Sequence, residues 1–147
     1  MKTIISLFIP LCVTMSLEAQ ELKPFKHDTY GLYGYKDGKG QVVVQPLFDY
    51  AGNFFEGVAV VAVGGKWGYI DRSGKQAIPL KYEEASEFSE GLAAVKLNGK
   101  WGYIDKTGAI KIVFIYADAK RFTGCCAEVT MIDGDEFRID KAGNEVQ

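Results

Sequence analysis

Apolar residues occur in short runs separated by turn residues, a pattern typical of β-strands. The run from Leu92 to Leu97 is largely apolar and ends at the dipeptide Asn98-Gly99. Asn-Gly favours a two-residue hairpin turn, because both central positions of that turn need a positive φ. Lys100 to Ile104 then contains Trp, Tyr and Ile, which favour strands, and Ala109 to Val113 gives a third run. This pattern predicts a three-stranded β-meander.

The same pattern returns after 34 residues. The sequence KWGYID occurs at Lys66 to Asp71 and again at Lys100 to Asp105. Four other landmarks keep this spacing, apart from a last step of 35 residues in the fourth: an aromatic residue, an alanine, a phenylalanine and an Asp-x-x-Gly turn. Their positions are Phe48, Tyr82 and Tyr116; Ala51, Ala85 and Ala119; Phe54, Phe88 and Phe122; and Asp37, Asp71, Asp105 and Asp140. A short unit repeated in this way indicates a stacked array.

The repeat also sets the expected domain boundaries. We expect a repeat domain over residues 31–147, with units at about 31–65, 66–99 and 100–134 and a partial copy at 135–147. The segment Leu80 to Glu90 links one unit to the next and is expected to hold a turn or one helical turn. Three units with degraded ends close a ring poorly. We therefore predict an all-β fold of tandem three-stranded meanders in an open array, with a partial propeller-like arrangement as the alternative.

Three segments carry a resemblance to a known family. Trp67 to Gly74, Trp101 to Gly108 and Phe88 to Val95 resemble the bacterial WG-repeat family, over about residues 31–147. The resemblance implies a β-rich and often exported bacterial protein. It implies no catalytic residue, because the motif residues of the family look structural. The chain departs from the pattern at Cys125 and Cys126, where the earlier copies have a glycine followed by an aliphatic residue.

The N-terminus has the layout of a secretory signal. A short basic start, Met1-Lys2, precedes an uncharged and mostly apolar run from Ile4 to Leu17, and small residues follow. The run is too short for a membrane span. We expect residues 1–19 to be a signal peptide cleaved after Ala19, residues 20–30 to be a lead-in, and the mature chain to reach the periplasm, cell surface or medium. Lipid attachment at Cys12 is the alternative.

Composition and charge narrow the classes of partner. The chain has 17 Lys and Arg against 19 Asp and Glu, a formal net charge of −2, and no basic stripe. This charge argues against nucleic acid as a partner. After the N-terminal run, no apolar stretch approaches membrane-spanning length. We expect a protein partner or, failing that, a glycan. Edge strands at the ends of an open array also permit self-association.

Cysteine and histidine suggest neither a metal nor a cofactor. The chain has one histidine, His27, and no Cys-x-x-Cys spacing, so a zinc site is not predicted. Neighbouring residues on an extended strand point to opposite faces. A bond between them would need strained geometry, so we expect Cys126 to be buried like a small hydrophobic residue and Cys125 to be partly exposed. A vicinal redox pair or an intermolecular disulfide is the alternative.

The acidic residues do not predict an enzyme. The Asp-x-x-Gly carboxylates are expected to accept local backbone hydrogen bonds in type I turns, because a calcium loop has denser carboxylates. Glu83-Glu84 and the pair Asp133 and Asp135 suggest glycoside hydrolysis, which needs two carboxylates at a set separation in a cleft. These acids lie in expected turns and connectors, so we expect a non-catalytic protein.

Aromatic side chains are the candidate binding residues. They form two rows along the array, namely Tyr33, Trp67 and Trp101, and two residues later Tyr35, Tyr69 and Tyr103. Such rows either form the core between units or offer a shared face to a sugar or a partner. We favour the core for the tryptophans and leave both places open for the tyrosines. The sequence thus predicts an exported binding or scaffold protein of the bacterial envelope that mediates protein–protein interaction. A carbohydrate- or cell-wall-binding module is the alternative.

Overall fold

The structure, a computed structural model, describes residues 21–147, which form four antiparallel sheets. The first sheet contains β1 (Lys23–Lys26), β2 (Tyr33–Lys36) and β3 (Val42–Phe48). The second contains β4 (Tyr50–Phe55), β5 (Val58–Val63), β6 (Lys66–Asp71) and β7 (Gln76–Tyr82). The third contains β8 (Glu84–Ala85), β9 (Leu92–Leu97), β10 (Lys100–Asp105) and β11 (Ile110–Tyr116). The fourth contains β12 (Asp118–Ala119), β13 (Cys126–Thr130), β14 (Glu136–Asp140) and β15 (Glu145–Val146).

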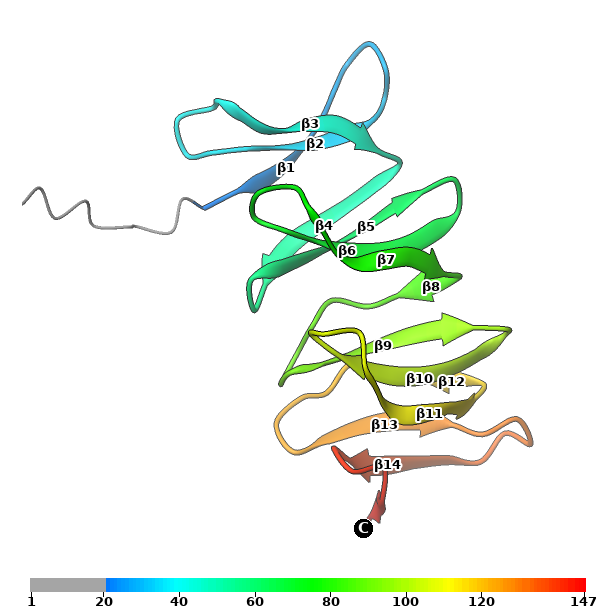
Figure 1. The fold of residues 1–147 in the computed structure, drawn as a ribbon. Coiled ribbons are helices and arrows are strands. Elements are labelled where there is room, and N and C mark those ends of the chain that lie inside the picture. The colour runs from blue at the N-terminus through cyan, green and yellow to red at the C-terminus, as the bar shows by residue number, and fades with distance from the viewer. Residues whose placement is uncertain (1–20) are drawn as a thin grey trace, which may run out of the picture.

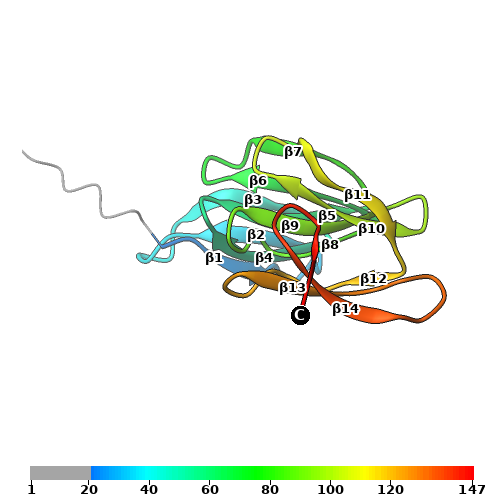
Figure 2. The same cartoon turned by 90° about the horizontal axis from the view of Figure 1, so that it is seen from below.

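The sheets are stacked in sequence order. Figure 1 shows β1 to β3 at one end of the stack and β14 near the other, and Figure 2 looks along the stack. The all-β open repeat array that the sequence predicts is confirmed. The signal peptide expected at residues 1–19, with Cys12, lies outside the described residues.

Each complete sheet is the predicted meander with a fourth strand added. The extra strand comes from the connector, as β4, β8 or β12, and pairs with the first strand of the following meander. The helical turn that was one expectation for Leu80 to Glu90 is wrong, because that connector forms β8 instead. Residues 21–147 contain no helix that could span a membrane.

Both ends of the repeat domain are more complete than the sequence indicates. The lead-in at residues 20–30 supplies β1, which pairs along its whole length with β2. At the other end, the partial copy at 135–147 forms β14 and β15 and completes a fourth sheet. Four sheets therefore stack where three full units were expected.

The inner sheets are buried on both faces, which explains their unbroken apolar strands. In β5, Val58 and Val60 join the core shared with the third sheet, whereas Ala59 and Val61 join the core shared with the first. Strand β9 divides its residues in the same way between the cores on its two sides. Strands covered on both faces need apolar residues at every position rather than at every second one.

A close approach between strands explains why the middle residue of each Trp-Gly-Tyr motif is a glycine. Gly102 lies where β11 bulges against β10, at a register shift between Tyr103 and Trp101. A Cβ atom on Gly102 would lie 2.7 Å from the carbonyl oxygen of Ile112. The same approach recurs at Gly68, whose Cβ would lie 2.7 Å from the carbonyl oxygen of Ile78. Any side chain at these glycines must therefore displace backbone.

We expect Gly102→Val to lower the free energy of unfolding by about 3 kcal/mol or more, because overpacking against backbone cannot be relieved by rotating a side chain. Urea denaturation of the purified chain measures this change. Gly38→Ala is the matched control, since nothing lies within 4 Å of a Cβ atom there. Equal stability of the Gly102→Val variant and the wild type would contradict the packing role of the motif.

Candidate functional site

The two predicted aromatic rows lie on the inner strands β2, β6 and β10, and their members differ in burial. Trp101 and Tyr103 share one face of β10, as predicted, and both pack in the core between the third and fourth sheets. Trp67 and Tyr69 do the same one sheet earlier. The structure therefore brings the two rows together within each sheet, and burial decides which of them a ligand can reach.

The second row is fully buried and ties each sheet to the connector that follows it. Tyr35, Tyr69 and Tyr103 each have 0% exposure. The Tyr103 hydroxyl donates a hydrogen bond to the carbonyl oxygen of Lys120 at 2.7 Å. Tyr69 donates in the same way to Ser86, and Tyr35 to Gly52. These acceptors lie 17 residues after each tyrosine, so the contact is part of the repeat.

The tyrosine rings meet the repeated phenylalanines. Tyr103 packs edge-on against Phe122 with ring centroids 5.0 Å apart, and Tyr69 packs edge-on against Phe88 at 4.8 Å. Burial raises the pKa of all three phenols far above the usual range. Of the two places that the sequence left open for Tyr35, Tyr69 and Tyr103, the structure has the core, where these side chains are out of reach of a ligand.

The first row is only half-buried and keeps part of each ring accessible. Trp67 packs on the core and lies beside Tyr50, with ring centroids 4.9 Å apart. The ammonium of Lys96 lies 6.0 Å from the centre of the Trp101 ring. Tyr33 has Lys26 over its ring at 5.5 Å. Of the six predicted binding residues, these three rings alone can contact a ligand.

The Asp-x-x-Gly carboxylates form turns, as predicted. In the third sheet, Asp105 Oδ1 accepts hydrogen bonds from the backbone N–H groups of Thr107 at 2.9 Å and Ala109 at 3.1 Å. The Thr107 hydroxyl donates a third bond to this oxygen, and these bonds hold the pKa of Asp105 below its usual range. Asp37, Asp71 and Asp140 accept backbone bonds from the same two relative positions.

The paired acids also serve turns and ion pairs. The Glu83 carboxylate accepts a hydrogen bond from Gly99 N–H in the hairpin turn at 3.1 Å. Glu84 pairs with Lys96 at 2.7 Å. Asp133 Oδ1 lies 3.4 Å from the backbone nitrogen of Asp135. Among residues 21–147, no three His, Cys, Asp or Glu side chains are grouped so that they could hold a metal ion.

Sequence reasoning missed a row of exposed apolar side chains on two outer strands. On β3 these are Val42, Val43 and Leu47, and on β11 they are Ile110, Val113 and Ile115. Their exposed fractions run from 40% at Ile115 to 63% at Leu47. Both strands lie at the edge of their sheets. A difference between the copies could have revealed these residues from the sequence, because β7 has Gln76 and Lys81 where β11 has Ile110 and Ile115.

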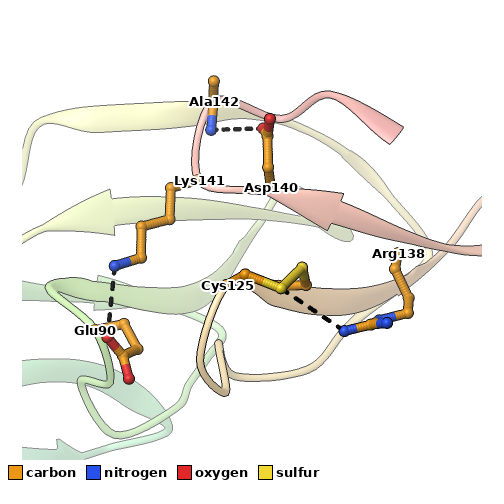
Figure 3. The surroundings of a disulfide bond; sticks show 7 residues. Glu90, Cys125, Arg138, Asp140, Lys141 and Ala142 are labelled. Atoms are coloured by element: carbon orange, nitrogen blue, oxygen red, sulfur yellow. Dashed lines mark hydrogen bonds and ion pairs between the residues drawn. A yellow bond between two sulfur atoms is a disulfide. The ribbon is translucent and has the colours of Figure 1, made fainter. Parts of the chain in front are cut away.

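Cys125 and Cys126 form a disulfide with each other, so the structure has the vicinal pair that was the alternative rather than two unbonded cysteines. The expected burial is nevertheless found, with Cys126 7% exposed and Cys125 exposed. Neighbouring side chains point to opposite faces only on an extended strand. Cys125 instead lies in the turn before β13, so its sulfur can reach that of Cys126. Figure 3 shows this bond with the Arg138 side chain directed at it.

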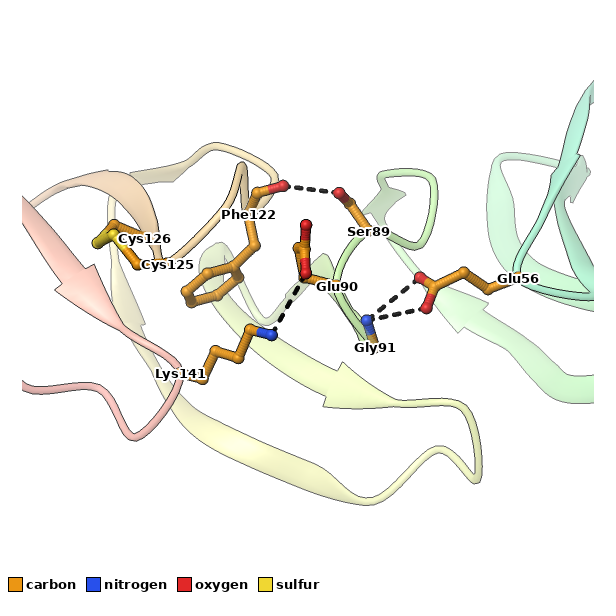
Figure 4. A network of polar contacts seen from close by, with 8 residues as sticks. All are labelled: Glu56, Ser89, Glu90, Gly91, Phe122, Cys125, Cys126 and Lys141. Carbon is orange, nitrogen blue, oxygen red and sulfur yellow. Dashed lines mark hydrogen bonds and ion pairs between the residues drawn. A yellow bond between two sulfur atoms is a disulfide. The ribbon is translucent and has the colours of Figure 1, made fainter.

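Polar contacts between sheets converge on the turns of this region, as Figure 4 shows. The Glu56 carboxylate accepts a hydrogen bond from Gly91 N–H in the next sheet at 3.0 Å. The Ser89 hydroxyl donates to the carbonyl oxygen of Phe122 at 2.7 Å. Lys141 pairs with Glu90 at 3.5 Å. These contacts join successive sheets on the side that carries the disulfide.

Comparison with known proteins agrees with the repeat geometry. The sequence model of the family described as "WG containing repeat" matches residues 33–67, 67–101 and 101–127. Neither the curated proteins nor the solved structures include a match to the chain. The first two matched segments run from one first-row aromatic residue to the next and the third begins at Trp101, so the family unit and the structural repeat have the same period.

We expect Tyr103→Phe to lower the free energy of unfolding by about 0.5–1.5 kcal/mol, because it removes the part-buried hydrogen bond to the Lys120 carbonyl. Thermal or urea denaturation measures this loss. Tyr30→Phe is the matched control, since Tyr30 is 72% exposed and its hydroxyl has no partner to lose within the described chain. A loss no larger than that of the control would contradict the tethering role of the hydroxyl.

The same tyrosines predict how stability depends on pH. Their pKa is raised in the folded state above the unfolded value of about 10. The unfolded chain therefore releases these protons first, so their contribution is complete below about pH 10 and is lost as the pH rises further. Phenolate absorbance and circular dichroism should change together in one alkaline transition. Phenolate formation by every tyrosine without loss of β-structure would contradict this expectation.

Proposed function

Because the chain belongs to the WG containing repeat family, we propose that it is a non-catalytic binding or scaffold protein that recognises another protein. The observation that carries the proposal is the apolar character of the edge strands β3 and β11. An edge strand offers unpaired backbone donors and acceptors, and exposed apolar side chains add area that a partner can bury. Two such strands on one stacked array give two places of attachment.

The middle copy supports this interpretation, because it shows what the fold itself requires. Strand β7 is an edge strand with the same register, yet it has Gln76 and Lys81 where β11 has Ile110 and Ile115. It also has Pro79, which protects an edge because proline has no N–H to offer; β3 has a proline too, Pro46, so β11 is the strand of the three that has none. Apolar residues at these positions are therefore not needed for folding, and partner binding accounts for them.

We expect the double variant Ile110→Gln and Ile115→Lys to fold like the wild type and to lose its partner. Both substitutions copy residues that β7 already has. Chemical cross-linking of the purified chain to envelope fractions, followed by mass spectrometry, compares what each form captures. Ile132→Lys is the matched control, because Ile132 is 68% exposed but lies outside the edge strands.

Three outcomes of this experiment are informative. Partners lost by the double variant and kept by Ile132→Lys support the proposal. A second copy of the chain as the captured partner supports it as self-association. Binding of soluble cell-wall glycan that survives the double variant would contradict it and would favour the accessible rings of Trp67 and Trp101 as a carbohydrate site.

We also propose that the protein is exported to the periplasm, cell surface or medium. The support is the short basic start and the uncharged run from Ile4 to Leu17. Expression of the full chain in a bacterial host, followed by intact-mass measurement, should give a mature form that begins at Gln20. A form that retains Met1 and stays inside the cell would contradict the export. A lipid-modified form that begins at Cys12 would mean cleavage before Cys12 and attachment to a membrane, the alternative to cleavage after Ala19.

A further inference from the structure

We propose that the Cys125–Cys126 disulfide is a thiol–disulfide exchange site that reacts with anionic low-molecular-weight thiols. The bond joins neighbouring residues on a turn at the surface of the last sheet. Adjacency, accessibility and a nearby guanidinium distinguish it from a structural disulfide. This site is independent of the edge strands and adds a second chemistry to the protein.

The disulfide contributes little to the stability of the fold. A disulfide stabilises mainly by closing a loop in the unfolded chain, and the effect grows with loop length. The sequence separation here is one residue, so no loop is closed. The equivalent turns of the two preceding sheets, at Glu56-Gly57 and Glu90-Gly91, occupy the same position in the repeat and contain no cysteine. The bond is therefore not required for the architecture.

Adjacency also makes the bond easy to reduce. The two Cα atoms are 3.8 Å apart because a single peptide unit joins them. Disulfides ordinarily span about 4.4–6.8 Å between Cα atoms, and bonds outside this range are more reducible. Labile disulfides of this kind are the ones that proteins use for exchange rather than for support.

The turn that carries the cysteines differs from its two counterparts. In the earlier turns two successive residues have positive φ, such as Glu90 at 57° and Gly91 at 82°. In the third turn only Gly124 does, at 65°. Cys126 N–H lies 3.5 Å from the Thr123 carbonyl oxygen, whereas the equivalent bond from Leu92 is 3.1 Å. The turn that contains the cysteines is therefore closed by a longer hydrogen bond than the equivalent turn of the preceding sheet.

The surroundings of the bond favour a negatively charged reactant. Arg138 Nη2 lies 3.9 Å from Cys125 Sγ, as Figure 3 shows. A hollow of about 490 Å³ beside it is lined by Lys120, Arg121, Thr123, Cys126, Glu128 and Arg138. Lys120 and Arg121 have carboxylate partners, Asp118 and Glu87. Glu128 stands opposite Arg138 across the β13–β14 pair. With two of the three cations already paired, Arg138 is the cation that lies next to the sulfur and can meet an incoming anionic thiol.

The exchange proceeds in two balanced steps. A thiolate attacks the accessible sulfur of Cys125 and forms a mixed disulfide, and the electron pair of the broken S–S bond leaves on Cys126, which takes a proton from water. A second thiolate then attacks the sulfur of the bound thiol, which releases the small-molecule disulfide and a Cys125 thiolate beside Arg138. Two thiols are oxidised and one protein disulfide is reduced. A guanidinium at this distance stabilises the thiolate that forms.

The test uses the full chain in its oxidised form and three thiols of different charge, namely glutathione (anionic), mercaptoethanol (neutral) and cysteamine (cationic). Alkylation followed by mass spectrometry counts the free thiols and detects mixed disulfides over time. We expect reduction by all three when each is in excess, with glutathione fastest per thiolate. Arg138→Gln should slow the glutathione reaction about fivefold, as expected for one charge near 4 Å in a solvated site. Lys100→Gln, on another part of the surface, should leave the rate unchanged.

A further variant separates failure of folding from failure of the site. Gly124→Glu, Cys125→Gly and Cys126→Leu together copy the turn of the preceding sheet, and this form should fold without any thiol reaction. Two results would overturn the proposal. One is an oxidised chain that stays oxidised in excess glutathione. The other is a reduction rate that depends neither on the charge of the thiol nor on Arg138.

Discussion

The buried tyrosine hydroxyl is the contact on which the stacking depends. Each sheet ends in a connector that must turn away from its edge and begin the next sheet. Tyr35, Tyr69 and Tyr103 fix that turn, because each hydroxyl donates to a backbone carbonyl of the connector 17 residues later. The bond of Tyr35 is buried and those of Tyr69 and Tyr103 are part-buried, and each joins the connector to the strand that bears the tyrosine. The phenylalanine that meets each ring adds apolar area at the same point.

The glycine of the motif makes this arrangement possible. The strand beside each tyrosine comes close at the preceding residue, and at Gly68 and Gly102 the neighbouring backbone occupies the space of a side chain. The Trp-Gly-Tyr motif is therefore a packing unit in which the three residues have separate tasks. The tryptophan covers the rim of the core, the glycine admits the bulged strand, and the tyrosine reaches the connector.

Strands and turns were readable from the sequence because their requirements are local. A hairpin turn such as Asn98-Gly99 needs residues that accept positive φ, and both residues do so in the structure. Burial of the second aromatic row was not readable, since it depends on a neighbouring sheet that the local sequence does not describe. Strands β8 and β12 were missed because they have two residues each, too few for a period to appear. The disulfide was missed because the two cysteines were placed on a strand rather than in a turn.

A repeat protein contains its own comparison, since each copy shows which residues the fold tolerates at a given position. Lys81 and Pro79 in β7 show that the outer strand need not be apolar, so isoleucine and valine on β11 require another explanation. Glu90-Gly91 shows that the turn needs no disulfide. The cysteines after Gly124 therefore also require an explanation other than folding. Both departures lie on the third and fourth sheets. In a repeat array, positions that differ between copies without a structural reason are therefore the places where a specific function is to be tested first.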